Sequence, residues 1–237
     1  MHTVAVLYPG HSAEDEFRTL ESLVPGSRFP VVHTWEGSTD HDLPALLALG
    51  SREHLAPAAA RARAHSPDAV VWACTSGSFV YGWEGCREQA EWIREASGAP
   101  SSSTSLAFAA AVRHLGLRRV SVAATYPEDV ASHFVRFLER DGITVTALSS
   151  YDVPSGEDAG LLDAEWVLAT ARAADVAEAE CLLIPDTALH TVEVLPRLEE
   201  TLGLPVLTAN QVTAWHGLRT AGHPARAGGL GALFGAR

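Results

Sequence analysis

The chain of 237 residues contains no lysine, because all 17 of its basic residues are arginine. Without lysine there is no Schiff-base nucleophile, which excludes pyridoxal-phosphate enzymes and lysine-type aldolases. The Walker lysine of a phosphate-binding loop is excluded for the same reason.

Cysteine is also scarce. The three cysteines, Cys74, Cys86 and Cys181, are an odd number and do not form a disulfide framework. The eleven histidines include no i,i+4 pair, and the chain has no HEXXH or Cys-X-X-Cys spacing, so we expect no dedicated metal site. Cys86 and Cys181 fall inside apolar or helical patterns, and we interpret both as packing residues.

Long apolar runs are missing too. No run approaches the roughly 20 residues of a membrane span, and no secretory signal precedes the first strand pattern, so we expect a cytoplasmic protein. The net charge of −12 argues against nucleic acid or an anionic membrane as a partner, because both need a basic surface. With 47% hydrophobic and 19% charged residues, the composition is that of a globular protein with a proper core.

Short apolar runs alternate with helical patterns along the chain, which predicts an α/β fold with a parallel sheet in each half. The second half repeats the first: a strand at 120–124 ends on Tyr-Pro, as the strand at 3–8 does, and the strand at 181–184 is the counterpart of 69–73. The expected division is residues 1–115, residues 116–210, a helix at 211–222 that packs back on the first half, and a Gly/Ala-rich tail at 223–237.

The turns after the two matched strands carry the candidate chemistry. Aligning the halves places Asp186 on Cys74, and carboxyl ends of parallel strands are where ligands bind. Backbone N–H groups and a helix start after Cys74 predict a lowered thiol pKa and a nucleophile, although a small buried core residue is the alternative. Asp186 as an acid near neutral pH needs a raised pKa, hence burial or a neighbouring anion.

Neighbouring donors are candidates to hold a carboxylate. Hydroxyls and backbone N–H groups of Thr75, Ser76 and Thr187 fit this role, with helix capping as the alternative. Further candidates to contact the substrate lie on the same or similar turns, where a structural or half-exposed role is the alternative: Pro9, His11, Tyr126, Ala188, His190 and Asn210.

Four segments carry a family resemblance: LYPGHSAEDEF, VVWACTSGSFVYG, VAATYPEDV and LLIPDTALHTVEVLPRLEETLGLPVLTANQVTAWHGLR. Together they resemble the aspartate/glutamate racemase superfamily, and within it the maleate cis–trans isomerase and arylmalonate decarboxylase branch. The resemblance implies two Rossmann-like domains related by pseudo-twofold symmetry, a site between them and no cofactor. It matches Cys74 to the first of the two cysteines of the maleate isomerases, whereas Asp186 replaces the second, which is the cysteine that the decarboxylases keep. It also places Thr75, Ser76 and Tyr126 at dioxyanion-hole positions, with Thr187 as a further backbone donor.

The leading hypothesis is therefore a cofactor-independent, maleate isomerase-like enzyme that acts on a small carboxylate or dicarboxylate. Cys74 as thiolate attacks or deprotonates the carbon next to a carboxylate, and Asp186 passes a proton on the opposite face. Arylmalonate-type decarboxylation and amino-acid racemisation are alternatives, as is a non-catalytic carboxylate-binding protein. The only further partner that we expect is a second copy of the chain in a homodimer.

Overall fold

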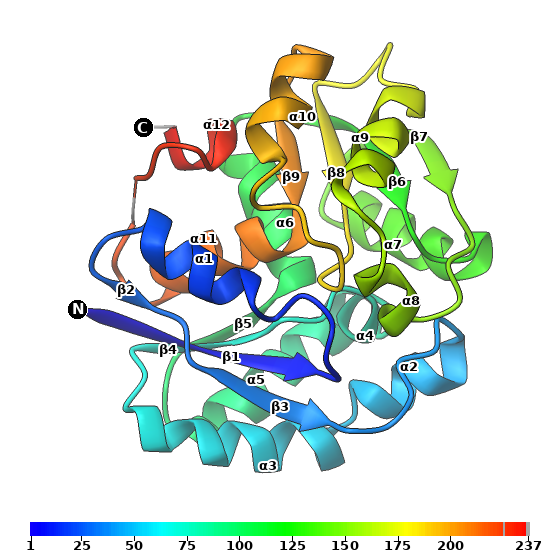
Figure 1. Cartoon of the computed structure of the whole chain (residues 1–237). Helices are drawn as coiled ribbons and strands as arrows, with labels where there is room; N and C mark the ends of the chain where they lie inside the picture. The colour runs from blue at the N-terminus through cyan, green and yellow to red at the C-terminus, as the bar shows by residue number, and fades with distance from the viewer. Residues whose placement is uncertain (225, 236–237) are drawn as a thin grey trace.

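The computed structural model describes residues 1–224 and 226–235 and confirms the predicted α/β class (Figure 1). A parallel five-stranded sheet belongs to the first half, in the order β2-β1-β4-β5 with β3 also paired to β1. Its strands are β1 (His2–Pro9), β2 (Ser27–Arg28), β3 (Val31–Trp35), β4 (Ala69–Trp72) and β5 (Ser101–Ser103).

A second parallel sheet, of four strands, belongs to the second half and runs in the order β7-β6-β8-β9. Its strands are β6 (Arg119–Ala124), β7 (Thr144–Ser150), β8 (Cys181–Ile184) and β9 (Val206–Thr208). The central strands β4 and β8 are buried over their whole length, as their unbroken apolar sequences predict.

Helices flank both sheets. In the first half they are α1 (Glu16–Leu23), α2 (Leu43–Leu49), α3 (Arg52–Ala62), a 3-10 turn (Arg63–His65), α4 (Ser76–Phe79), α5 (Gly82–Ser97) and α6 (Thr104–His114). In the second half and beyond they are α7 (Glu128–Arg140), α8 (Gly156–Gly160), α9 (Ala164–Ala173), α10 (Leu195–Leu202), α11 (Ala209–Thr220) and α12 (Gly231–Gly235). None of the described helices combines the length and apolar character needed to cross a bilayer.

Helix α11 follows the last strand of the second half but packs on the first half, against α1, α6 and the strands β1, β4 and β5 (Figure 1). Gly217 permits this approach, since a Cβ there would lie 2.6 Å from Cγ1 of Val4 and 3.1 Å from Cγ1 of Val71. The two halves therefore share α11 as a common element.

The Gly/Ala-rich tail expected at 223–237 contains a short helix that the sequence did not indicate. Leu230, Leu233 and Phe234 are buried, so α12 and the residue before it belong to the hydrophobic core. Residues 225 and 236–237 of the tail lie outside the described residues.

The helix that the sequence predicts over 46–65 is divided into α2 and α3 at Gly50. Gly50 lies directly against the turn after β4, because a Cβ there would meet the Gly77 carbonyl oxygen at 2.2 Å and Nε2 of Gln89 at 2.6 Å. Nε2 of Gln89 donates hydrogen bonds to the carbonyls of both glycines, at 2.8 and 2.9 Å. This contact holds the Cys74 turn in place from outside the sheet.

Gly50→Ala should lower the free energy of unfolding by about 1–3 kcal/mol, because a methyl group would be forced into a packed contact with backbone. Urea unfolding measures the change. Gly228→Ala is the matched control, since a Cβ there meets no atom within 4 Å. Equal stability of the two variants would contradict the close approach of Gly50 to the turn.

Candidate active site

The ends of both sheets meet at a small, partly open cavity with space of about 30 Å³. The first half contributes Tyr8, Pro9, Ser12, Thr39, His41, Leu46, Leu49, Cys74 and Ser76, and the second half contributes Gly156, Asp186, Thr187 and Ala188. No arginine is among the described lining residues, so neutral donors and His41 are the groups available to bind an anion.

Cys74 lies on the turn between β4 and α4 and is 5% exposed. Its Sγ accepts a hydrogen bond from the Gly77 N–H at 3.3 Å and lies 3.8 Å from Oγ of Ser76. Burial nevertheless raises the pKa of the thiol to about 12, and the charge of Asp186 acts in the same direction. The expected lowering of the thiol pKa is therefore not supported, because desolvation of the buried thiol outweighs the backbone donor.

Asp186 follows β8 on the other side of the cavity and is 4% exposed. One carboxylate oxygen accepts a hydrogen bond from the Thr125 hydroxyl, and the other accepts the Ala188 N–H at 2.9 Å. Ala188, expected to contact the substrate, lines the cavity, but its N–H is engaged by Asp186. The structure brings the thiol and the carboxylate to one cavity, from the two matched turns.

The candidate oxyanion donors divide into two groups. Ser76 and Thr187 line the cavity. Thr75 is fully buried, and its hydroxyl oxygen has no hydrogen-bond partner among the described residues. Tyr126 donates its phenol to the Pro185 carbonyl, and burial raises its pKa well above the ordinary value. Its hydroxyl therefore needs to change partner before it can bind a substrate.

Besides Thr75 and Tyr126, three further residues expected to contact the substrate do not line the cavity. His11 is exposed, and its Nδ1 lies 2.9 Å from Oε1 of Glu14. His190 pairs with Asp15 at 2.9 Å beside a separate cavity of about 310 Å³. Asn210 is fully buried behind the Thr187 turn.

The sequence did not single out several residues that the cavity uses. Tyr8 is the next-to-last residue of β1, and its hydroxyl donates to the Thr187 carbonyl at 2.9 Å. Thr39 and His41 come from the loop between β3 and α2. The Nδ1 of His41 contacts the Val153 carbonyl at 2.8 Å, and a bridge pairs Asp40 with Ser155. Loops of both halves thus border the cavity.

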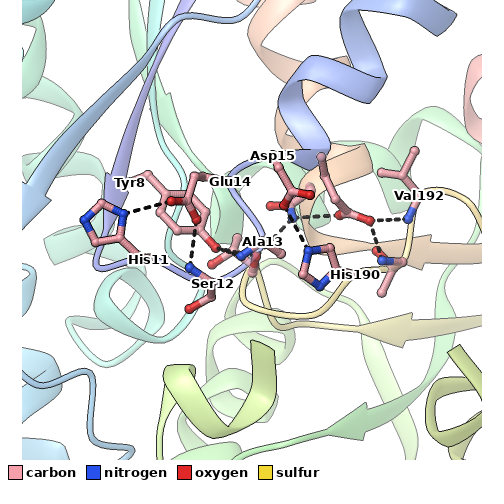
Figure 2. Close-up of polar contacts among 12 residues, drawn as sticks. Tyr8, His11, Ser12, Ala13, Glu14, Asp15, His190 and Val192 are labelled. Atoms are coloured by element: carbon pink, nitrogen blue, oxygen red, sulfur yellow. Dashed lines mark hydrogen bonds and ion pairs between the residues drawn. The ribbon is translucent and has the colours of Figure 1, made fainter. Parts of the chain in front are cut away.

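A buried carboxylate, Glu16, ties the first half to the turn that carries Asp186. It accepts hydrogen bonds from the N–H groups of Thr191 and Val192, the latter at 2.6 Å, and from Nδ2 of Asn210 at 2.8 Å. The same Asn210 amide donates to the Thr187 carbonyl at 3.0 Å. Figure 2 shows this region, with the Tyr8 hydroxyl accepting the Ala13 N–H on one side of the view and Val192, whose N–H donates to Glu16, on the other.

Two parallel α/β halves with a small cavity between their strand ends define the class of protein, and solved structures share this fold over nearly the whole chain. A double mutant of arylmalonate decarboxylase (glycine to cysteine and cysteine to serine) in liganded form has a TM-score of 0.87 at 26% identity, covering 99% of each chain. A Cys-to-Ser mutant of the Nocardia farcinica maleate cis–trans isomerase, with a covalently bound succinylcysteine intermediate, has a TM-score of 0.89 at 23% identity and covers 98% of each chain.

The family model for arylmalonate decarboxylase matches residues 51–234, and the chain belongs to this family of enzymes. Arylmalonate decarboxylase of Bordetella bronchiseptica is 32% identical over 145 residues. That match spans 60% of this chain and 60% of the length of the relative.

The buried Glu16 should make the free energy of unfolding depend on pH. Burial raises the pKa of its carboxyl from 4.5 to about 7, although the hydrogen bonds that it accepts act in the opposite direction. Because the pKa is higher in the folded chain than in the unfolded one, protonation of Glu16 stabilises the folded chain. This stabilisation is fully present below pH 4.5 and is lost as the pH rises through about 7. Relative to Glu16→Gln, the native chain should therefore lose up to about 3 kcal/mol of unfolding free energy from about pH 5 to about pH 8.

Urea unfolding of both chains at a series of pH values measures this difference. The titration of other groups contributes about equally to the unfolding free energy of the native chain and of Glu16→Gln, so it cancels in the difference between them. A difference that stays constant across the range would show that the carboxyl is not protonated near neutral pH.

Proposed function

We propose that the chain is a cofactor-independent enzyme that transfers a proton to the carbon next to a carboxylate, through an enediolate, with Cys74 as the proton donor. The reaction that fits best is decarboxylation of a substituted malonate. The observation that carries this proposal is the buried Cys74 thiol, with its pKa of about 12, on a cavity shared with Asp186.

The proposed reaction uses the thiol in its protonated form. The bond between the central carbon and one carboxylate breaks, carbon dioxide leaves, and the electron pair stays on the remaining carbon and carboxylate as an enediolate. Cys74 then gives its proton to that carbon, and after the product leaves the thiolate takes a proton back from solvent water. Asp186 lies on the opposite half of the cavity. A strongly basic enediolate accepts a proton readily even from a weak acid, so a high thiol pKa is no obstacle.

Neutral donors would stabilise the enediolate. Ser76 and Thr187 line the cavity, and the hydroxyl of Thr75 is buried without a partner among the described residues. Thr75 is not among the residues that line the cavity, so Ser76 and Thr187 are the donors that an incoming anion would meet first. The space in the cavity is small, about 30 Å³, so the loops after β3 and β7 would move apart to admit an arylmalonate.

Maleate-type isomerisation is the second candidate, favoured by the position of Cys74 and by the structural relative that carries a succinylcysteine intermediate. There the thiolate adds to one alkene carbon, the alkene electrons move into the carboxylate, the new single bond rotates and the carbon–sulfur bond breaks. This route needs the thiol to lose its proton first, which the raised pKa opposes. The expected cytoplasmic location and homodimer remain part of the proposal and rest on the sequence.

Cys74→Ala should lower kcat for an arylmalonate such as phenylmalonate by about 10²–10⁴-fold, the usual contribution of a positioned acid. In deuterium oxide the native product should carry deuterium at the carbon next to the carboxylate. Cys86→Ala is the matched control, because that thiol is buried against Ser103 away from the cavity. Thermal stabilisation by the malonate without turnover, unchanged in Cys74→Ala, would instead identify a carboxylate-binding protein.

The pH dependence separates the two catalytic routes. A proton donor with a pKa of about 12 stays protonated, so kcat/KM for phenylmalonate should not rise between about pH 7 and about pH 9 through Cys74. A thiolate nucleophile requires kcat/KM to increase up to tenfold per pH unit in this range. Such an increase, together with conversion of maleate to fumarate, would favour the isomerase route.

A further inference from the structure

Two imidazoles and a carboxylate lie close together outside the cavity, where the ends of β1 and β3 meet. The register pairs Tyr8 with His33, and the Gly10 N–H donates to the Trp35 carbonyl at 3.0 Å. Gly10 has φ +60°, a conformation that favours glycine, and it turns the chain so that His11 faces His33. The two imidazole rings are 4.1 Å apart between centroids.

Glu14 completes the group. Its Oε1 lies 2.9 Å from Nδ1 of His11 and 3.8 Å from Nε2 of His33. Its other oxygen accepts the Ser12 N–H at 2.7 Å, which fixes the orientation of the carboxylate. Figure 2 shows His11 and Ser12 converging on Glu14.

We propose that His11, Glu14 and His33 form a surface site for a zinc-like divalent transition-metal ion. The three ligand atoms all lie within 4.8 Å of one another. Zinc bonds to nitrogen and oxygen of about 2.0–2.1 Å in a tetrahedron place ligand atoms roughly 3.3 Å apart, between the two distances measured to Glu14. Two imidazoles and one carboxylate are a donor set that zinc and its neighbours accept, and magnesium and calcium do not prefer.

The site has room for the ion and for further ligands. His11 has 68% of its side chain exposed, so its ring can rotate to close the remaining gap, and water can fill the open position. Glu36 and Arg61, which share a surface cavity with His33, carry opposite charges and offset one another near the site. Spacing rules miss this site because His33 comes from a neighbouring strand.

A bound ion would clamp the end of β1 to β3 beside the cavity. None of the three ligands lines the cavity, whereas Pro9 and Ser12, on the same turn, do. The metal therefore acts on the shape of this turn and is not part of the proposed proton transfer. Metal binding at this site does not depend on the proposed reaction.

Isothermal titration calorimetry of the tag-free full chain with zinc chloride tests the site. The native chain should bind one ion at this site, and His33→Ala and Glu14→Gln should each weaken that binding at least about tenfold, because even outer-shell changes cost 10–100-fold at metal sites. His190→Ala is the matched control, since His190 forms a two-group pair with Asp15 and should leave the binding unchanged. Repeating the titrations in a Cys74→Ala background removes the cavity thiol as a competing ligand.

A thermal shift gives a second readout that does not depend on activity: zinc should raise the Tm of the native chain but not of His33→Ala. The proposal is overturned if the native chain binds no zinc, or if His33→Ala or Glu14→Gln binds it with native affinity and stoichiometry. It is also overturned if His190→Ala weakens binding as much as they do.

Discussion

Desolvation of the Cys74 thiol, in a cavity that also contains the Asp186 carboxylate, is the constraint on which the proposed chemistry depends. Burial raises the thiol pKa to about 12, which keeps the proton on sulfur. A thiol of that kind is a weak nucleophile and a usable acid toward a carbanion-like intermediate. The parallel sheets produce this arrangement directly, because β4 and β8 end at the same cavity from opposite halves.

The position of Asp186 depends on contacts that cross between the halves. Tyr8 and Asn210 both donate to the Thr187 carbonyl, and Glu16 holds Asn210 together with two backbone N–H groups of the following turn. Gly217 lets α11, which begins with Ala209 and Asn210, lie against the first sheet. Helix α11, which follows the last strand of the second half, therefore packs on the first sheet and holds the Thr187 turn through Asn210.

The sequence predicted most of the fold, because alternating apolar strands and helices reveal a parallel sheet without knowledge of tertiary contacts. The repeat also pointed to Cys74 and Asp186, since matched strand ends reach the same edge. The sequence could not show that Asn210 donates to Glu16 or that His41 lines the cavity from a loop. Nor could it show that burial raises the Cys74 pKa more than the backbone donor lowers it. These depend on contacts between residues far apart in the chain, as does the division of the helix at Gly50.

A crystal structure of the Cys74→Ser chain with bound phenylmalonate would test the central claim most directly. The serine oxygen and an Asp186 carboxylate oxygen should lie on opposite faces of the malonate carbon, the serine within about 3–3.5 Å of it, in near-attack range. A malonate bound outside the cavity, or one with both side chains on the same face, would contradict the proposed mechanism.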